Sequence, residues 1–300
     1  MTDDKSHSYR ETPVTKQYIE KGEAPKYRII ADMHYGEHTF DRQCFRNAMD
    51  DAVDEGRRII LLGDLVTSIT KDDRRHSVEE HKISFADQTD WLDKIISYYA
   101  DNIDWVFQGN HEQKLIAAQG DFISNICERH EVKYAGFQLN IRLQKGNGNH
   151  LNFYLTHGNK TFNYRAGEGR RKKTNKEVRI KDLLRPVCEA DIYIMGHAHD
   201  GVLSTDPFEL RLINETGQRY EEKYLPENDD KIYACCPSML RTYQKGENYG
   251  SRSMFPPSEV GYIDIDLTKG LDVDDVRLVV SNDNEFMVKE SYKNRRWGQG

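Results

Sequence analysis

Asp32 and His34 stand one residue apart at the end of an apolar, strand-like run, so both side chains can leave the strand in the same direction. The same arrangement, a β-prone run followed by Asp, Asn or His, recurs at four later places: Asp64, Asn110 with His111, His157, and His197 with His199. Carboxylate, amide and imidazole groups are metal ligands. Five strand ends that converge on one edge of a sheet would therefore form one metal site.

A single histidine after a strand more often makes a buried hydrogen bond than binds a metal, so the prediction rests on the whole set. Glycines beside these residues, at positions 63, 109, 158 and 196, allow tight turns and close backbone approach. Mixed oxygen and nitrogen ligands in this number suit two ions that share a carboxylate, and they exclude neither Mn²⁺, Fe nor Zn²⁺. Two ions about 3.5–4 Å apart can activate a bridging water and hold a phosphoryl group during in-line attack.

Five short motifs carry a resemblance to a known family. They are Asp32-x-His34, Gly63-Asp64, Gly109-Asn110-His111-Glu112, His157-Gly158 and Gly196-His197-x-His199. In this order they resemble the motifs of the calcineurin-like metallophosphoesterases, and they span residues 32–199, about half of the chain. The resemblance implies an α/β fold in which a two-sheet mixed β-sandwich is flanked by helices.

The resemblance also implies roles for these residues in a metal-dependent phosphoesterase. Asp32, His34, Asp64 and His199 resemble the ligands of one ion, and Asp64, Asn110, His157 and His197 those of the other. Asp64 would bridge, and the cofactors would be two divalent ions, with Mn²⁺ expected and Fe or Zn²⁺ as alternatives. His111 resembles the histidine that stabilises the transition state or protonates the leaving oxygen. Glu112 is expected either to orient His111 or to begin the following helix as an acidic residue.

The family hydrolyses several kinds of phosphate ester, so the motifs leave the substrate open. Serine/threonine protein phosphatases of the family carry Asp-Arg-Gly three residues after the second-motif aspartate, where this chain has Thr67-Ser68-Ile69. Nucleases and phosphodiesterases often have Asp or His at the Thr67 position, so this departure weakens that match too. We expect phosphodiester hydrolysis in nucleic acid or nucleotides by a metal-bridging water, with a phosphomonoesterase as the alternative. A non-catalytic scaffold would be expected to lose ligands, and none is missing.

A basic segment follows the His157 loop and supplies candidate phosphate contacts. We expect Arg165, Arg170, Arg171 and Lys172 to bind substrate phosphates, against the alternative of a solvated loop and helix start. Phe162 and Tyr164 are candidates for stacking on a base. A second basic, tyrosine-rich rim is expected at residues 241–252.

Hydrophobic periodicity places these motifs on alternating strands and helices. Strands are expected from about residue 27 and over 58–62 and 103–107, and helices over 41–56, 78–99 and 115–129. A hairpin over 137–156, a helix around 178–187 and a strand over 191–195 follow. Antiparallel strands are expected at 210–213, 220–225, 232–235, 260–265 and 276–280. The expected domain covers residues 25–283, between a polar arm (1–24) and a C-terminal tail (284–300), although a split near residue 135 stays open.

Composition narrows the class of protein. A chain of 300 residues with 37% hydrophobic residues can bury a substantial core, and its net charge of −7 argues against non-specific coating of nucleic acid. No apolar run approaches the roughly 20 residues of a membrane span, and the first residues lack the apolar core of a signal peptide. We therefore expect a cytoplasmic protein without a membrane partner, in which the five cysteines are reduced core thiols. The oligomeric state stays open.

Overall fold

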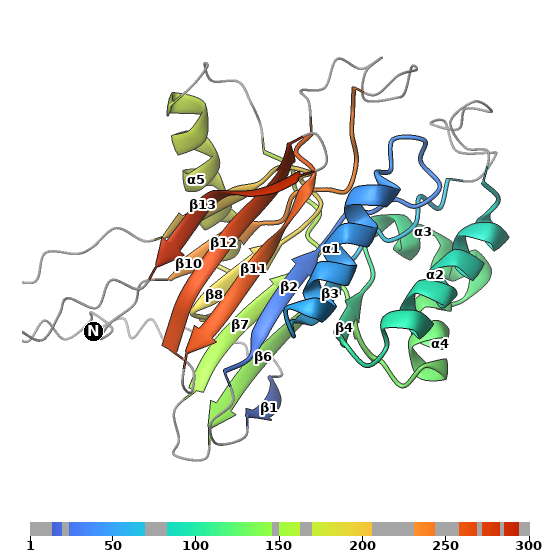
Figure 1. The fold of residues 1–300 in the computed structure, drawn as a ribbon, viewed down its shortest axis with the longest axis horizontal. Helices are drawn as coiled ribbons and strands as arrows, with labels where there is room; N and C mark the ends of the chain where they lie inside the picture. The colour runs from blue at the N-terminus through green and yellow to red at the C-terminus, as the bar shows by residue number, and fades with distance from the viewer. Residues whose placement is uncertain are drawn as a thin grey trace, which may run out of the picture.

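Two β-sheets packed face to face form the centre of the protein, and helices cover both outer faces (Figure 1). The computed structural model describes residues 14–19, 24–69, 83–145, 150–162, 170–205, 231–243, 258–268, 272–282 and 285–293. One apolar core, which includes Ile29, Ile60, Phe153 and Ile194, lies between the sheets. The expected two-sheet mixed sandwich flanked by helices is therefore confirmed.

The first sheet has seven strands in the order β13-β12-β11-β2-β3-β4-β5. Its parallel half contains β2 (Lys26–Ile30), β3 (Arg58–Leu62), β4 (Ile103–Phe107) and β5 (Lys133–Gly136). Its antiparallel half contains β11 (Gly261–Thr268), β12 (Asp272–Asn282) and β13 (Glu285–Lys293). The crossovers carry helices α1 (Arg42–Asp54), α2 (Phe85–Tyr99), α3 (Asn110–Gln119) and α4 (Phe122–Arg129). Apolar residues of α1, α2 and α4 form a second core against this sheet.

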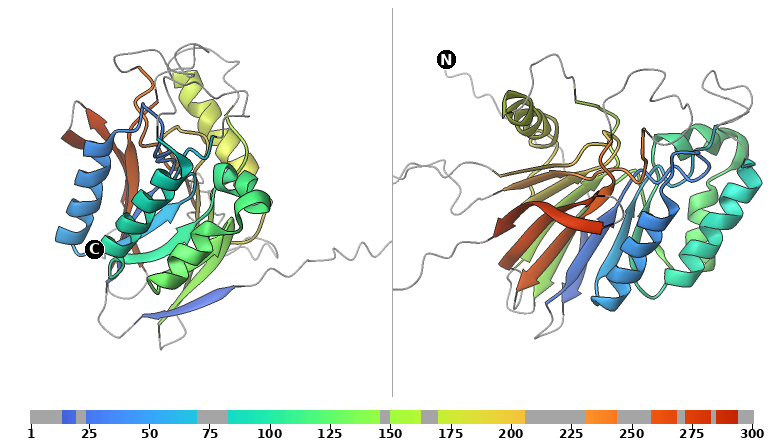
Figure 2. Two further views of the ribbon diagram at one scale, coloured as in Figure 1. Left: turned by 90° about the vertical axis from the view of Figure 1, so that its right-hand side faces the viewer. Right: turned by 45° about the horizontal axis from the view of Figure 1, so that its top comes forward.

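The second sheet has six strands in the order β1-β6-β7-β8-β10-β9. These are β1 (Thr15–Ile19), β6 (Gln138–Lys145), β7 (His150–Thr156), β8 (Ile192–Met195), β9 (Val202–Thr205) and β10 (Ile232–Cys235). Helix α5 (Arg170–Leu184) packs on its outer face through Ile180 and Leu184, which contact a cluster of tyrosines from β7, β8 and β10. The helices thus lie on opposite sides of the sandwich (Figure 2).

Local sequence signals account for the helix ends. Asp41 caps α1 by accepting a hydrogen bond from the Cys44 N–H (2.9 Å), and Gly56 follows the helix with φ +65°. The single helix expected over 115–129 is wrong. Gly120, with φ +72°, ends α3, and Asp121 caps the separate helix α4. Helix α2 begins at Phe85, and the earlier part of the expected helix, residues 78–82, lies outside the described residues.

The C-terminal strands correct the expected layout. The antiparallel strands expected at 260–265 and 276–280 correspond to β11 and β12, and they extend the first sheet because β11 pairs with β2. Strands from both sides of residue 135 therefore belong to this sheet. Strand β10, which was expected to be antiparallel, runs antiparallel to β9 and parallel to β8. Strands β1 and β13 lie in segments that the sequence analysis assigned to the terminal arm and tail.

Two short strands, β5 and β9, have no counterpart in the sequence analysis, because neither four-residue segment is a continuous apolar run of the kind that marks β8 and β10. The strands expected at 210–213 and 220–225 lie outside the described residues. Among the helices that the structure describes, none has the length and apolar character needed to cross a membrane.

Candidate metal centre

Seven candidate ligands come from the ends of five elements in both sheets. Asp32 and His34 follow β2, Asp64 follows β3, Asn110 begins α3 after β4, His157 follows β7, and His197 and His199 follow β8. The first sheet thus supplies the carboxylates and the amide, and the second sheet supplies three of the imidazoles. The structure brings these residues together, as the following distances show.

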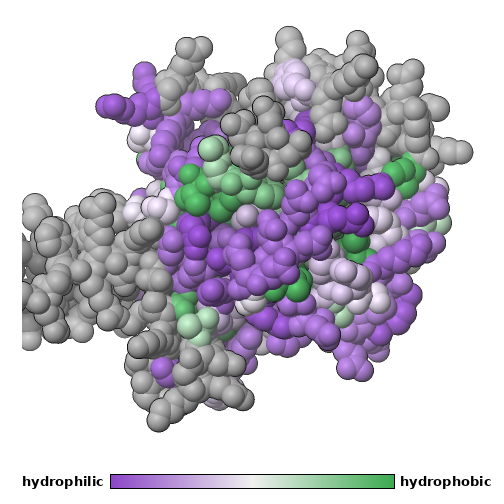
Figure 3. Space-filling view, in the orientation of Figure 1, coloured by the Kyte–Doolittle hydropathy of each residue, from purple (hydrophilic) through white to green (hydrophobic). Residues whose placement is uncertain are grey.

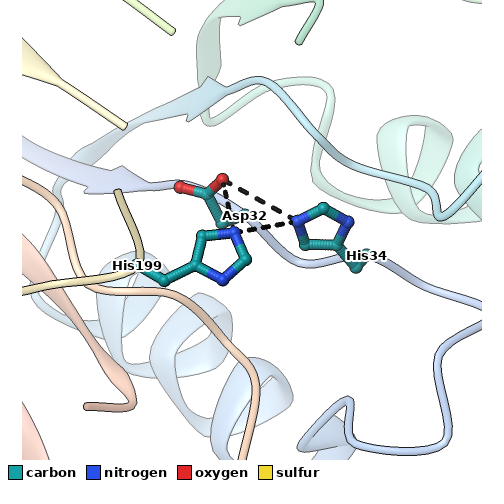
Figure 4. A group of neighbouring side chains, drawn as sticks. All are labelled: Asp32, His34 and His199. Carbon is teal, nitrogen blue, oxygen red and sulfur yellow. Dashed lines mark hydrogen bonds and ion pairs between the residues drawn. The ribbon is translucent and has the colours of Figure 1, made fainter. Parts of the chain in front are cut away.

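The first group contains Asp32, His34 and His199 (Figure 4). His34 Nε2 lies 3.1 Å from His199 Nε2, and Asp32 Oδ1 lies 3.2 Å from His199 Nε2 and 3.8 Å from His34 Nε2. Ligand atoms bound about 2.0–2.2 Å from one ion are spaced roughly 3–3.5 Å apart. Two of the three distances lie in this range and the third, between Asp32 and His34, is slightly longer, so the three atoms can share a single cation.

The second group contains Asp64, Asn110, His157 and His197. His157 Nε2 lies 3.2 Å from both Asp64 Oδ2 and Asn110 Oδ1, and His197 belongs to the same cluster of ligand atoms within 4.8 Å. Asp64 Oδ2 also lies 3.6 Å from His34 Nε2 in the first group. One carboxylate oxygen therefore faces both groups.

Buried side-chain atoms that lack a hydrogen-bond partner indicate whether these residues are suited to bind a cation. Within the described part of the chain, Asp32 Oδ1 and His197 Nδ1 are buried without a hydrogen-bond partner. A buried polar atom is costly to leave unpaired. An ion between these groups would satisfy lone pairs that the protein itself leaves unsatisfied, so the residues fit divalent metal binding.

The backbone of the ligands is unusual. Among the described non-glycine residues, seven have positive φ, and five of these are candidate ligands: Asp32 (52°), His34 (46°), Asp64 (48°), His197 (66°) and His199 (53°). This left-handed conformation is uncommon for residues with a side chain and concentrates at functional sites. It turns the chain sharply where each strand stops.

Main-chain carbonyls orient two of the imidazoles. His157 Nδ1 donates to the Leu62 carbonyl oxygen (2.9 Å), which leaves Nε2 facing Asp64 and Asn110. His111 Nδ1 donates to the Thr67 carbonyl oxygen (2.5 Å), and its ring meets His34 edge-on with centroids 4.6 Å apart. A hydrogen bond at one ring nitrogen fixes the tautomer and presents the other nitrogen.

The carboxylates and imidazoles shift one another's pKa values. Burial disfavours the charged form of His157, but the Asp64 carboxylate outweighs burial and raises the pKa of His157 to about 10. Burial likewise opposes ionisation of Asp64, yet the His157 imidazole holds the pKa of Asp64 well below its usual range. Burial, followed by the nearby His111, keeps the pKa of His34 well below its ordinary value. Asp64 thus favours positive charge at His157, whereas burial favours the neutral form of His34.

Glu112 forms hydrogen bonds with main-chain N–H groups and does not orient His111. Its buried carboxylate accepts hydrogen bonds from the N–H groups of Asp64 (3.1 Å), Val66 (2.9 Å) and Gly109 (2.7 Å). Burial and then the charge of Asp64 raise the pKa of Glu112 to about 7. Of the two expected roles, the acidic residue in the first turn of a helix is the one observed. Glu112 fastens the Asp64 loop to the start of α3.

Sequence reasoning missed the part that Thr67 plays in the site. Its side chain is fully buried, and its hydroxyl donates to the His34 carbonyl oxygen (2.8 Å). The only signal was its place three residues after Asp64, where the sequence analysis noted a departure from the family pattern.

The expected substrate contacts lie on and before α5. Arg170 and Arg171 are exposed in the first turn of α5, where hydrophilic residues cover the upper left of the molecule (Figure 3). Lys172 lines a cavity of about 300 Å³ between α5, β9 and β13. Arg165 and Tyr164 lie outside the described residues.

Two expected surface contacts are used inside the protein. Phe162 is 4% exposed and belongs to the core under α5, so the prediction that it stacks on a base is wrong. Arg241, expected on the second basic rim, forms an ion pair with Asp41 and also donates to Cys44 Sγ and Ser281 Oγ. Residues 244–252 of that rim lie outside the described part of the chain.

Comparison with known proteins gives distant structural similarity. The sequence matches no known family description and no curated protein. YfcE, a phosphoesterase from E. coli, aligns with a TM-score of 0.42 and 14% identity over 89% of this chain and 98% of its own. GAP50, the anchor in the inner membrane complex of Plasmodium, aligns with a TM-score of 0.44 and 13% identity over 90% of this chain and 88% of its own. Similarity at this level carries no argument about activity, which rests on the site.

Proposed function

We propose that this protein is a metal-dependent phosphoesterase that holds two divalent ions, with Mn²⁺ expected before Fe or Zn²⁺. The observation that carries the proposal is the position of Asp64, whose Oδ2 lies 3.6 Å from His34 Nε2 and 3.2 Å from His157 Nε2. A carboxylate between two groups of ligands is the arrangement that a pair of ions requires. The resemblance of the five motifs to calcineurin-like metallophosphoesterases supports the same assignment.

The roles of the ligands follow from their grouping. Asp32, His34, Asp64 and His199 would hold one ion, and Asp64, Asn110, His157 and His197 the other. When bound, the ions supply Lewis acidity and an activated water at neutral pH. The chain supplies the rigid frame: the His197 N–H donates to Asp32 Oδ2 (2.8 Å), and the His111 N–H donates to Asp64 Oδ1 (2.8 Å). Each bond fixes one oxygen of the Asp32 or Asp64 carboxylate, and the other oxygen faces the imidazoles of the site.

His111 is the proposed proton donor. In hydrolysis the water oxygen forms a bond to phosphorus, the bond from phosphorus to the leaving oxygen breaks, and the water proton passes to solvent. His111 Nδ1 is held by the Thr67 carbonyl, so Nε2 of the protonated ring is the atom that gives its proton to the leaving oxygen.

The substrate is proposed to be a phosphodiester in nucleic acid or a nucleotide. Support comes from the basic start of α5, where Arg170, Arg171 and Lys172 face solvent or the cavity beside β9. The ion pair between Lys176 of α5 and Asp200 (2.6 Å) ties this helix to the residue after His199. Exposed cations on a helix that contacts a ligand loop suit additional phosphates of a polyanion.

Metal dependence and ester preference can be tested together. Protein stripped with a chelator should be inactive and should regain hydrolysis when Mn²⁺, Fe²⁺ or Zn²⁺ is added. Bis-p-nitrophenyl phosphate should be cleaved faster than p-nitrophenyl phosphate, and DNA, RNA and linear or cyclic nucleotides should include a substrate. Faster cleavage of the monoester would favour a phosphatase. Metal binding without hydrolysis of any ester would instead indicate a scaffold.

His111→Ala separates catalysis from metal binding. We expect turnover to fall about 10²- to 10⁴-fold, the range for loss of a general acid, while the bound metal per protein stays at the wild-type value. His130→Ala, which removes a histidine bonded to Asp93 on α2, provides the control and should keep full activity. Because His111 also lies within 4.8 Å of ligand atoms of His34 and Asp64, loss of one metal in the variant would make His111 a ligand instead.

A further inference from the structure

Thr67 connects three parts of the candidate site that are separate in sequence. Its N–H donates to the Tyr35 carbonyl (3.0 Å) and its Oγ1 donates to the His34 carbonyl (2.8 Å). Its own carbonyl oxygen accepts from His111 Nδ1 (2.5 Å). The residue is fully buried, so these bonds are shielded from competing water.

The loop that carries Thr67 is itself fixed. Glu112 accepts from the N–H groups of Asp64 and Val66 on one side of Thr67, so the loop cannot shift independently of α3. Main-chain hydrogen bonds also join this loop to the one that carries His34, among them His34 N–H to the Asp64 carbonyl (2.9 Å). The Thr67 hydroxyl adds a side-chain hydrogen bond between the same two loops, directly at His34.

We infer that Thr67 is a positioning residue that holds His34 and His111 in one rigid unit. Its hydroxyl fixes the His34 loop against the Asp64 loop, and its carbonyl aims the His111 ring. A misplacement of about 1 Å in such a unit can cost up to about 100-fold in rate. The inference rests on the proposed function, because it assigns Thr67 to the proton donor of that reaction.

The inference also specifies the ester. A fixed proton donor matters when the leaving group is an alcohol, because an alkoxide leaves poorly unless its oxygen is protonated. It matters little for a nitrophenolate, which leaves as an anion. The site is thus suited to esters of sugar or other alkyl hydroxyls.

Three variants test this role. Thr67→Val keeps the shape of the side chain and removes the hydroxyl, Thr67→Ala removes it with a smaller side chain, and Thr67→Ser restores it. Ser68→Ala is the matched control, since Ser68 Oγ is buried but has no hydrogen-bond partner among the described residues. For each variant, kcat and KM are measured with Mn²⁺ on a dinucleotide and on bis-p-nitrophenyl phosphate, and bound metal is counted.

We expect Thr67→Val and Thr67→Ala to lower kcat on the dinucleotide about tenfold, the size expected from one buried hydrogen bond. On the aryl ester the loss should stay below about threefold, with KM and metal content unchanged and with activity rescued in Thr67→Ser. Equal losses on both esters, loss of metal, or unchanged kcat would each overturn the inference while leaving the proposed function intact. Failure of the wild-type protein to hydrolyse either ester would overturn the proposed function and this inference with it.

Discussion

At the scale of single residues, the site combines strained backbone with hydrogen bonds that hold it. Left-handed backbone on a residue with a side chain costs about 1–3 kcal/mol. The strain is held in place by bonds between neighbouring loops, since Asp32 N–H donates to the Gly63 carbonyl (3.0 Å) and His34 N–H donates to the Asp64 carbonyl (2.9 Å). The ligand loops are therefore interlocked before any metal binds.

Gly109 shows how little space these loops leave. A Cβ at this position would lie 2.1 Å from Asp64 Oδ1 and 2.3 Å from Asp64 N, so Gly109→Ala must displace the carboxylate between the two ligand groups. We expect at least about tenfold weaker metal binding and a loss of about 1–3 kcal/mol in unfolding free energy. Metal titration and urea unfolding would measure both effects.

Gly120→Ala provides the control for that substitution, because Gly120 lies at the other end of α3 and has open space around its missing side chain. Its φ of +72° predicts a modest loss of stability with metal affinity unchanged. Equal metal affinity in both variants would show that Gly109 does not constrain Asp64.

Residue types were enough to predict which side chains meet in the site. Aspartate, asparagine and histidine at strand ends could be identified from sequence because each stands at a visible change from apolar to polar residues. Glu112 could be placed at the start of a helix, where it accepts from the Gly109 N–H, but its hydrogen bonds to Asp64 and Val66 could not be predicted. The contacts of Thr67 could not be predicted either, because they are made with other loops and the sequence contains no pattern for them.

At the scale of elements, helix ends decide how well the sequence predicts the fold. Helix α1 has a strong apolar stripe, an aspartate cap and a terminal glycine, and the structure shows all three. The break at Gly120 could not be recognised within the expected helix over 115–129, because the apolar pattern continues across it. Strand β13 lacked a clear alternation because Met287 and Val288 are both exposed at the edge of the sheet.

Helix α4 ends less favourably than α1, which leads to a stability prediction. Glu131 has φ +56° just after the helix, the position where α1 has Gly56. Because Glu131 is exposed and its conformation suits glycine, Glu131→Gly should raise the unfolding free energy by about 0.5–1 kcal/mol. Thermal and chemical unfolding of the purified variant would measure the change.

Glu128→Gly in the last turns of α4 supplies the opposite control and should lower stability by about 0.5–1 kcal/mol. If Glu131→Gly and Glu128→Gly lowered the unfolding free energy equally, the left-handed conformation of residue 131 would not contribute to stability.

At the scale of the whole molecule, the chain closes on itself through polar contacts outside the site. Arg241, which lies between β10 and β11, forms an ion pair with Asp41 at the start of α1 and also contacts Ser281 on β12. Burial opposes the ionised form of Asp41, but its hydrogen bonds with Arg241 and Cys44 lower the pKa of this carboxyl below its ordinary value.

A pH dependence of stability follows from that shift. A lowered pKa in the folded state stabilises the protein above the unfolded value of 3.8, and the contribution is lost as pH falls through the folded pKa. Asp41→Asn keeps a helix cap but removes the charge, so at pH 7 it should lower the unfolding free energy by about 1–2 kcal/mol.

The difference between wild type and Asp41→Asn should shrink as the pH drops below 4 and Asp41 becomes protonated. Urea unfolding from pH 3 to pH 7 would follow it. Asp121→Asn, at the cap of α4 where the observed partners are Ser124 and Tyr134, serves as the comparison. A difference that stays constant across this range would rule out a contribution from the Asp41 charge.

The origin of the candidate ligands in both sheets has a mechanical consequence. Hydrogen bonds from His157 to the Leu62 carbonyl and from His197 to Asp32 already join the two sheets at one end, and a pair of shared ions would add direct bonds there. Small relative movements of the sheets would then change the coordination distances directly. Mutations in the buried layer between the sheets, far from any reacting atom, would therefore change the metal coordination distances and with them the reaction rate.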